Sequence, residues 1–332
     1  MANASRPVQK RIDPARVPPR AQGGKGRSGK PGGQPPRVVA RKASASDWIG
    51  GARLRTLPLA VSPVALGTAS AYLLSNPGWH WVRGLLALIV AVALQIGVNY
   101  ANDYSDGIRG TDRYRVGPSR LTGSGAAKPR TVLAVAIAFL AIGGIAGVVL
   151  IALTGYWWLL AVGAACIIAA YFYTGGKHPY GYYGLGELFV FVFFGLVATA
   201  GTTYTQVGTV NLESWLAGVA AGLLACAVLM VNNLRDLEQD KLAKKRTLAV
   251  LVGNRAARIL YCVFVAVPFA ILIFFAVFYE KAPLVYFTLL GAIPAMIITL
   301  TGKTAPEFMV ALRLTSLTAL LFGLGLAAAI AF

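Results

Sequence analysis

The stretch LLALIVAVALQIGVNYANDYSD, residues 85–106, decides the fold of this chain. It opens with a continuous apolar run and closes with two acids, Asp103 and Asp106. A helix needs about 20 mostly apolar residues to cross the hydrocarbon core of a bilayer. A barrel strand would alternate between apolar and polar residues, which this run does not do. The stretch therefore predicts a membrane-spanning helix that ends in carboxylates at one membrane surface.

The rest of the chain shares this apolar character. Of its 332 residues, 57% are hydrophobic and only 13% are charged, and the mean hydropathy is +0.64. A soluble domain carries about 25% charged residues, so the composition excludes an ordinary soluble protein. We predict an all-α, multi-pass membrane bundle of nine transmembrane helices. Their expected ranges are 53–75, 82–103, 131–153, 157–174, 187–206, 214–234, 257–279, 283–301 and 308–331.

The loops between these helices differ in charge, and this difference predicts the orientation of the chain. The loops on one side are basic, above all 104–130 and 235–256, whereas those on the other side carry only Lys281 as a basic residue. Loops rich in Lys and Arg stay in the cytoplasm. We therefore expect a plasma-membrane protein with its N-terminus and its acidic helix ends on the cytoplasmic side, and its C-terminus outside.

Residues 1–46 form a separate segment by composition. They hold eleven Lys and Arg residues against one acid, Asp13, and they are rich in Pro and Gly. Such a composition predicts disorder. No apolar segment follows within the first 30 residues, so we expect no secretory signal. Because no nucleic-acid-binding motif accompanies the charge, we interpret the segment as a basic cytoplasmic tail that lies against anionic lipid, and residues 47–332 as the membrane domain.

Two short segments carry half of the twelve acids, and each stands at the end of a predicted span on the same side. Several carboxylates together repel one another unless a cation holds them. Within each segment an Asn and two Asp residues recur at helical spacing and so share one helix face. These residues are Asn99, Asp103 and Asp106 in the first segment, and Asn232, Asp236 and Asp240 in the second. Hard oxygen ligands of this kind predict a Mg²⁺ site.

Other residues near the acids have competing interpretations. Either segment alone could be a solvated helix end with local salt bridges. Glu238 points away from the Asn232–Asp240 face, so we expect it to pair with a nearby Lys. Asp112 lies beyond the helical run and has three open roles, as a metal ligand, a loop cap or a partner for Arg113 or Arg115. The three cysteines lack metal-ligand spacing and are predicted to pack between helices.

Basic residues at the same predicted membrane face fit the other half of such a site: two follow Asp240 closely, one lies in the loop between the fourth and fifth spans, and two lie at the start of the first span. Lys and Arg bind phosphate oxygens, and Mg²⁺ commonly binds phosphates together with one or two carboxylates. The mixture of charges therefore predicts a bound diphosphate. The candidate residues are Arg53, Arg55, Lys177, Lys245 and Arg246.

These motifs resemble those of the UbiA-type intramembrane prenyltransferases, and most closely the branch that prenylates 1,4-dihydroxy-2-naphthoate. The resemblance covers about residues 47–332. The matching stretches are RLRTLP (53–58), NDYSDGIRGTD (102–112), GPSRLTGSG (117–125), YTGGKHPYGYYGLGE (173–187), NNLRDLEQD (232–240) and KRTLA (245–249).

The resemblance implies a central cavity whose two acidic motifs face each other below cytoplasmic cap helices. It implies that polyprenyl diphosphate and 1,4-dihydroxy-2-naphthoate react in a Mg²⁺-dependent step that releases carbon dioxide and diphosphate and gives demethylmenaquinone. The metal would be held by Asp103, Asp106, Asp236 and Asp240, with Asp112 as a fifth candidate. Tyr173 and Lys177 match a family element beside the prenyl diphosphate, and Asn99 and Asn232 would bind substrate. Arg53 or Arg55 is our candidate for the acceptor carboxylate.

Two alternatives stay open at this point. A secondary transporter could use intramembrane acids for cation coupling, although transporters place such acids near the bilayer midplane. A second possibility is another branch of the same superfamily with 4-hydroxybenzoate, homogentisate or haem as acceptor. The sequence leaves the prenyl length, the order of ring attack and decarboxylation, and the oligomeric state open.

Overall fold

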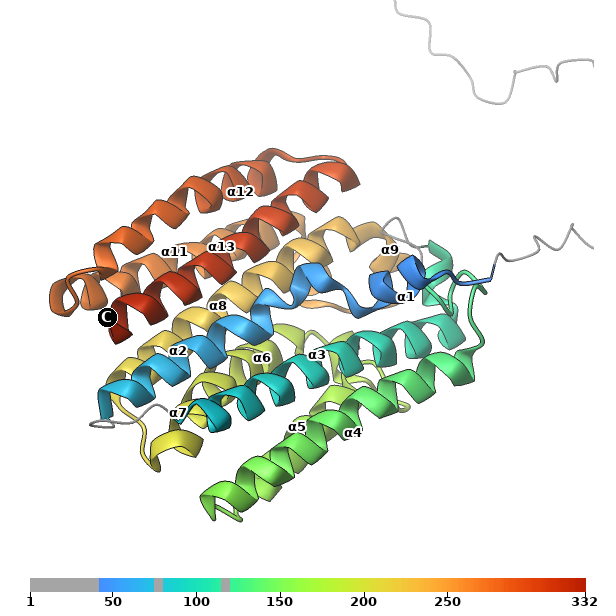
Figure 1. The fold of residues 1–332 in the computed structure, drawn as a ribbon. Coiled ribbons are helices and arrows are strands. Elements are labelled where there is room, and N and C mark those ends of the chain that lie inside the picture. The colour runs from blue at the N-terminus through green and yellow to red at the C-terminus, as the bar shows by residue number, and fades with distance from the viewer. Residues whose placement is uncertain (1–41, 75–79, 115–119) are drawn as a thin grey trace, which may run out of the picture. The chain divides into compact units, whose positions relative to one another are not determined.

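The computed structural model describes residues 42–74, 80–114 and 120–332, and it is helical throughout those ranges, with no strand among them (Figure 1). The predicted disordered tail lies almost wholly outside the described residues. The elements are α1 (Ala45–Ala52), η1 (Leu54–Thr56), α2 (Pro58–Leu74), α3 (Trp81–Arg109), η2 (Thr111–Tyr114), α4 (Pro129–Thr154), α5 (Leu159–Phe172), η3 (Tyr180–Tyr182), α6 (Gly186–Val190), η4 (Phe191–Val197), α7 (Ala198–Val207), α8 (Leu212–Arg235), α9 (Leu237–Leu242), α10 (Leu248–Val252), α11 (Asn254–Phe278), η5 (Ala282–Thr288), α12 (Leu289–Thr301) and α13 (Ala305–Ala331).

All nine predicted ranges contain helix, but fewer segments pass as full spans. Among the described residues, seven segments are long and apolar enough to cross a membrane, counting α6, η4 and α7 as one and η5 and α12 as another. An eighth results if Ala45–Thr56 and Pro58–Leu74 form one broken span, bent by 46°. The helix α5 has only 14 residues and falls below that length. The membrane bundle is therefore confirmed, whereas the count of nine is not established.

The helix α8 is the core of this bundle. It packs against α2, α11, α13 and η4 (Figure 1). Within its apolar 18-residue stretch, 72% of the residues are buried. Small residues allow this close packing, as in other membrane helices. A Cβ atom added at Gly195 of η4 would lie 2.6 Å from the carbonyl oxygen of Gly218 and 2.6 Å from Cα of Gly222. The Asn and Asp residues at the end of α8 are thus held on a rigid element.

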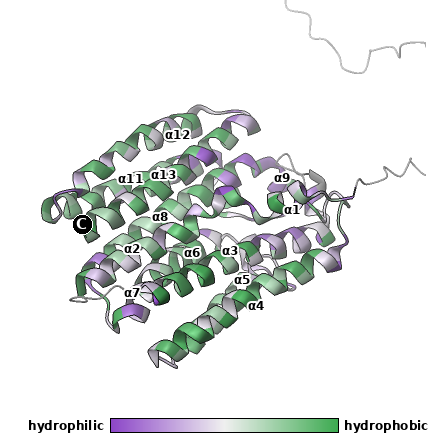
Figure 2. Ribbon diagram, in the orientation of Figure 1, coloured by the Kyte–Doolittle hydropathy of each residue, from purple (hydrophilic) through white to green (hydrophobic). Residues whose placement is uncertain are grey.

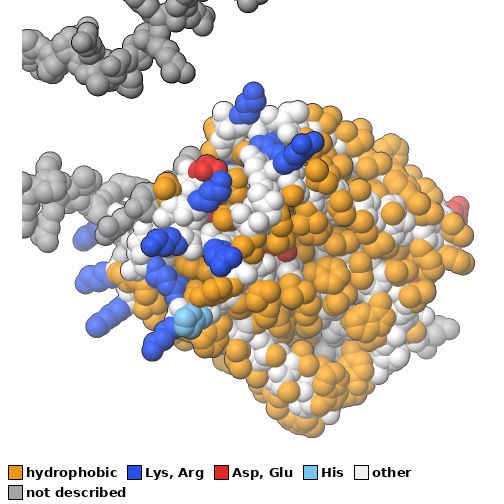
Figure 3. Space-filling view, turned by 180° about the vertical axis from the view of Figure 1, so that it is seen from behind, with side chains coloured by type: hydrophobic (Ala, Val, Ile, Leu, Met, Phe, Trp, Pro, Cys, Tyr) orange, Lys and Arg blue, Asp and Glu red, His pale blue; other side chains and the backbone are white. Residues whose placement is uncertain are grey.

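Polar residues gather at one end of the helices, which we call the acidic end because Asp106 of α3 and Asp236 after α8 lie there. The helix bodies are apolar, and hydrophilic residues appear near α1 and α9 (Figure 2). Lys and Arg side chains are concentrated toward the same end (Figure 3). This distribution matches the basic loops of the sequence, and the cytoplasmic orientation of that end stays a prediction.

The short helix α1 folds back onto α3 at the acidic end. Ser44 and Asp47 form a capping box at its start, and Arg53 ends it in the left-handed conformation with φ 54°. The Tyr100 hydroxyl donates to the Trp48 carbonyl at 2.6 Å, and the Asn99 amide donates to the Ala52 carbonyl at 2.9 Å. These bonds hold the segment that follows α1, so that its basic residues line the interior.

Candidate functional site

A cavity of about 550 Å³ opens into the bundle below the acidic end. Its polar rim includes residues from both predicted motifs, since Asn99 and Asn102 of α3 and Asn232 of α8 all line it. Arg53 and Arg55 line the same rim. The body of the cavity is apolar, with walls from α2, α3, α4, α5, η4 and α7. Residues of the two motifs therefore share one chamber, as the sequence predicts.

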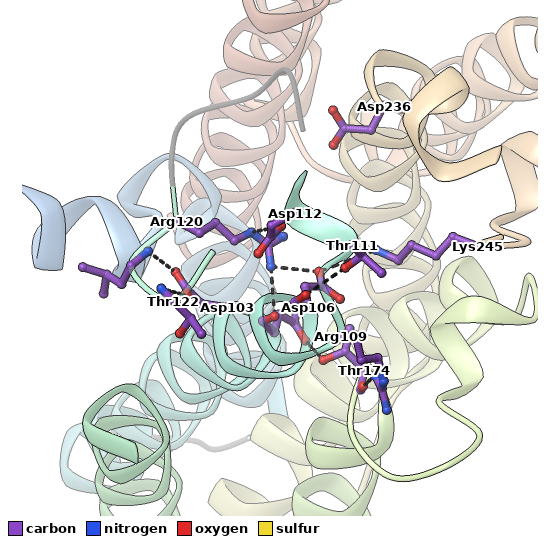
Figure 4. Close-up of polar contacts among 12 residues, drawn as sticks. Asp103, Asp106, Arg109, Thr111, Asp112, Arg120, Thr122, Thr174, Asp236 and Lys245 are labelled. Carbon is purple, nitrogen blue, oxygen red and sulfur yellow. Dashed lines mark hydrogen bonds and ion pairs between the residues drawn. The ribbon is translucent and has the colours of Figure 1, made fainter. Parts of the chain in front are cut away.

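Asp106 is the centre of the polar contacts beside this chamber. Its Oδ2 atom lies 2.8 Å from Nη1 of Arg120 and 3.6 Å from Nζ of Lys245 (Figure 4). Its Oδ1 atom accepts a bond from the Tyr182 hydroxyl at 2.6 Å. The carboxylate is 2% exposed. Lys245 comes from the second motif's loop, so this ion pair joins the two motifs directly.

Asp103 makes a different set of contacts from its neighbour. Its Oδ1 accepts the backbone N–H of Thr122 at 2.8 Å, and its Oδ2 accepts that of Leu121 at 3.0 Å (Figure 4). Both carboxylate oxygens therefore hold the loop that follows Arg120. None of the acids of the two motifs lines the cavity, so the lining does not distinguish Asp103 from the others; its two backbone partners do. The geometry fits an anchor for the loop more closely than a metal ligand.

Arg120 lies between two acids of the first motif. Besides its bond to Asp106, its Nε lies 3.5 Å from Oδ1 of Asp112, and its Nη1 donates to the Asn102 carbonyl at 2.9 Å. The neighbouring carboxylates raise the pKa of Arg120 above its ordinary value, against the opposing effect of burial. Asp112 thus has Arg120 as an ion-pair partner. The other partners considered, the Arg113 side chain and Arg115, lie outside the described part of the structure.

The second motif presents Asp236 toward this group from the other side (Figure 4). The guanidinium of Arg235 holds Asp236 with two bonds of 2.8 Å and 2.5 Å. Asp240 is buried, and Thr247 Oγ1 lies 3.5 Å from its Oδ2. Glu238 is exposed and pairs with Lys241 at 2.9 Å, which confirms the expectation that it points away and meets a lysine.

The remaining predicted residues divide into two groups. Tyr173 lines the cavity and contacts the ring of Tyr180 edge-on, with ring centroids 5.5 Å apart. Lys177 and Arg246 are exposed. The structure therefore brings Tyr173, Arg53 and Arg55 to the cavity. It places Lys245 beside Asp106 and leaves Lys177 and Arg246 on the surface.

Three residues of the cluster were absent from the sequence-based candidates: Asn102, Arg120 and Tyr182. Asn102 had a usable signal, because Asn102 and Asp106 repeat the four-residue spacing of Asn232 and Asp236. Arg120 and Tyr182 had no signal in helical periodicity, because they reach Asp106 from loops, and only their place in the family-like stretches 117–125 and 173–187 marked them.

The donor set is suited to a metal that arrives with a diphosphate. Among residues 42–74, 80–114 and 120–332, no three His, Cys, Asp or Glu side chains converge closely enough to hold a metal by themselves. Mg²⁺ usually takes one or two protein carboxylates and completes its shell with phosphate and water oxygens. Buried carboxylates beside cationic side chains fit that pattern.

This chain is similar to known proteins in sequence and in structure. A model of the UbiA prenyltransferase family matches residues 60–307. The chain is 50% identical over 304 residues to a 1,4-dihydroxy-2-naphthoate octaprenyltransferase of Mycobacterium tuberculosis, covering 87% of this chain and 98% of that protein. It is 39% identical over 217 residues to the protein of the same description from Escherichia coli, covering 64% and 70% of the two chains.

Solved structures show the same fold. A UbiA homologue from Archaeoglobus fulgidus bound to DMAPP and Mg²⁺ aligns with a TM-score of 0.57 at 17% identity, covering 85% of this chain and 99% of that one. A structure from work on digeranylgeranylglyceryl phosphate synthase aligns with a TM-score of 0.55 at 16% identity, covering 86% and 98%. At these identities the likeness concerns the fold alone.

Proposed function

The chain belongs to the UbiA prenyltransferase family, and on this premise we propose that it transfers a polyprenyl group from polyprenyl diphosphate to 1,4-dihydroxy-2-naphthoate. The observation that carries the proposal is one cavity lined by Asn102 and Asn232, with the ion pair between Asp106 and Lys245 joining the two motifs beside it. The acceptor is proposed from the names of relatives that match over most of their length. We place the enzyme in the plasma membrane with this site on the cytoplasmic side.

The proposed reaction balances without a further oxidant. A bond forms between the naphthalene ring and C1 of the prenyl group, while the C1–O bond breaks and its electron pair leaves with the diphosphate. The acceptor's carboxylate leaves as carbon dioxide, and its bonding pair stays with the ring. The immediate product is the reduced, quinol form of demethylmenaquinone. The balance is the same whichever of the two bond changes comes first.

The diphosphate is proposed to bind at the acidic end. Arg120 and Lys245 are already placed there by Asp106, and Lys177 and Arg246 are proposed as outer contacts from the surface. When bound, Mg²⁺ would neutralise charge that develops on the leaving diphosphate. The candidates to hold it are Asp106, Asp112, Asp236 and Asp240, one or two of them at a time together with phosphate oxygens. For Asp103 the two backbone contacts support a role in holding the loop instead.

An aromatic wall would shelter the reacting allylic carbon. Tyr173, Tyr180, Phe189 and Phe193 line the cavity in sequence, with successive ring centroids 5.5, 4.0 and 6.0 Å apart. Aromatic faces attract positive charge, and an apolar chamber excludes the water that would capture a carbocation. The wall therefore supports transfer to a ring rather than hydrolysis.

Arg55 is our candidate for the acceptor carboxylate. It lines the cavity and lies within electrostatic range of Arg235 and Arg313 as well as Asp236, so its surroundings carry excess positive charge. We expect Arg55→Gln to raise KM for 1,4-dihydroxy-2-naphthoate about 10- to 100-fold, as the loss of one charge-assisted contact would. KM for the prenyl diphosphate should change much less. Steady-state kinetics with each substrate varied in turn would check this, and the opposite pattern would contradict it.

Mass spectrometry of the product tests the whole proposal. Purified protein with Mg²⁺ would be given 1,4-dihydroxy-2-naphthoate and prenyl diphosphates of several lengths, with 4-hydroxybenzoate as a competing acceptor. The expected product has the prenyl group in place of the carboxyl group. Consumption of 4-hydroxybenzoate alone would move the chain to another branch of the family, and no consumption of any prenyl diphosphate would contradict the proposal.

The N-terminal tail is proposed to lie outside the catalytic unit. Contacts with the membrane domain begin within its last residues, where Ala43 N–H donates to the Ala126 carbonyl at 3.0 Å and Ser44 caps α1, so residues 43–46 belong to the folded domain. Deletion of residues 1–40 is therefore expected to leave turnover within about twofold of the full chain. An inactive truncation that still folds, by size-exclusion chromatography, would show that the tail takes part in catalysis.

A further inference from the structure

Tyr182 lies where three loops of the acidic end meet. Its hydroxyl donates to Oδ1 of Asp106 at 2.6 Å, across 76 positions of sequence. Its carbonyl accepts the backbone N–H of Arg246 at 3.0 Å. One residue of η3 thus touches the first acidic motif through its side chain and the second motif's basic segment through its backbone.

The ring of Tyr182 also lies under two cations. Nζ of Lys245 is 4.8 Å from the ring centroid, and the guanidinium carbon of Arg109 is 5.4 Å from it. Arg109 is fixed from its other end, because it donates to the carbonyls of Thr174 and Gly176. Cation–π contacts of this kind hold a charged group in place without neutralising it. Lys245 therefore keeps its charge for Asp106 or for an incoming anion.

Because of the hydrogen bond from Tyr182, the two oxygens of the Asp106 carboxylate have different partners. Oδ1 is committed to the phenol, and Oδ2 faces Arg120 and Lys245. Both cationic partners of Asp106, Arg120 and Lys245, therefore lie at Oδ2.

We propose that Tyr182 is a positioning residue for the diphosphate site: its hydroxyl orients Asp106 so that Oδ2 alone faces the metal and the diphosphate, and its ring holds Lys245 beside them. The inference rests on the proposed function of the same site. It predicts that Tyr182 acts on metal-dependent binding of the diphosphate through Asp106, and not on binding of the aromatic acceptor.

Tyr182→Phe tests the hydroxyl while keeping the ring, and Tyr183→Phe is a matched control. Tyr183 is the next residue, is exposed, and directs its hydroxyl to His178 at 3.1 Å instead. We expect Tyr182→Phe to weaken Mg²⁺-dependent binding of inorganic pyrophosphate, measured by calorimetry, about tenfold, and to raise KM for the prenyl diphosphate with KM for the acceptor unchanged. Tyr183→Phe should match the unmodified protein in every measurement.

A second variant separates positioning from a general structural role. In a chain that already carries Asp106→Asn, adding Tyr182→Phe should weaken pyrophosphate binding no further, because the residue acts through Asp106. An equal loss in both backgrounds would overturn the inference, and so would unchanged binding by Tyr182→Phe alone. If the unmodified protein bound no pyrophosphate with Mg²⁺, the proposed function itself would fail, which is a distinguishable result.

Discussion

Asp236→Asn is expected to lower turnover at least about 100- to 1,000-fold, the range seen when one electrostatic contact to a developing charge is lost. Asp236 is buried and is held by Arg235, which is itself 1% exposed in its side chain. An amide in place of the carboxylate leaves that guanidinium uncompensated and removes a proposed metal ligand. The amide has the same size and keeps one acceptor oxygen, so the fold should survive.

The measurement is kcat from chromatography of the prenylated product, with thermal unfolding as the check on folding. Glu238→Gln is a matched control, since it makes the same carboxyl-to-amide change two residues away, at an exposed position paired with Lys241. We expect that control to turn over like the unmodified enzyme. Normal turnover by Asp236→Asn would remove this residue from the mechanism.

Asp103→Asn is expected to lower activity strongly as well, but through the loop and not through the metal. The carboxylate accepts two backbone N–H groups, and an amide can accept only one of them without opposing the other with its own NH₂ group. Hydrogen bonds to charged groups contribute about 1.5–3 kcal/mol each, so the free energy of unfolding should fall by about that amount. Arg120, next to the anchored residues, should then lose its fixed place beside Asp106.

The two roles of Asp103 give different metal dependences. If Asp103 is an anchor, the residual activity of Asp103→Asn should reach half its maximum at the same Mg²⁺ concentration as the unmodified enzyme. If Asp103 is a ligand, that concentration should rise while thermal stability stays unchanged. Titration of Mg²⁺ together with thermal unfolding in detergent distinguishes the two, and the second pattern would restore Asp103 to the metal site.

Asp103 also shows what helical spacing predicts about a side chain and what it leaves open. At 3.6 residues per turn, Asp103 and Asp106 lie about 60° apart around α3, so the sequence correctly predicts that both belong to one broad face. That angle is enough for one carboxylate to meet the loop at residues 121–122 and the other to meet Arg120 and Lys245. Spacing alone does not reveal this division, because it describes the helix and not what packs opposite it.

The span count shows a similar limit. Apolar runs locate the nine predicted ranges, yet the first range, 53–75, leaves out α1, which ends at the left-handed Arg53. The segments Ala45–Thr56 and Pro58–Leu74 are bent by 46° relative to each other. The backbone leaves the helical conformation at Arg53, with φ 54° and ψ 56°, whereas Leu57, the residue before the proline, stays helical with φ −60° and ψ −28°. Whether the two segments form one membrane span depends on the angle between them, which hydropathy does not predict.

The apolar runs, the acids at their ends and the basic loops by themselves determined that this chain is a helical membrane bundle with a polar site at one end, because burial in lipid and charge at its surface act on each segment separately. Only the tertiary structure decided which carboxylate meets Arg120 and Tyr182. Those contacts join residues 14 and 76 positions apart, and they depend on how the loops fold back over the helix ends.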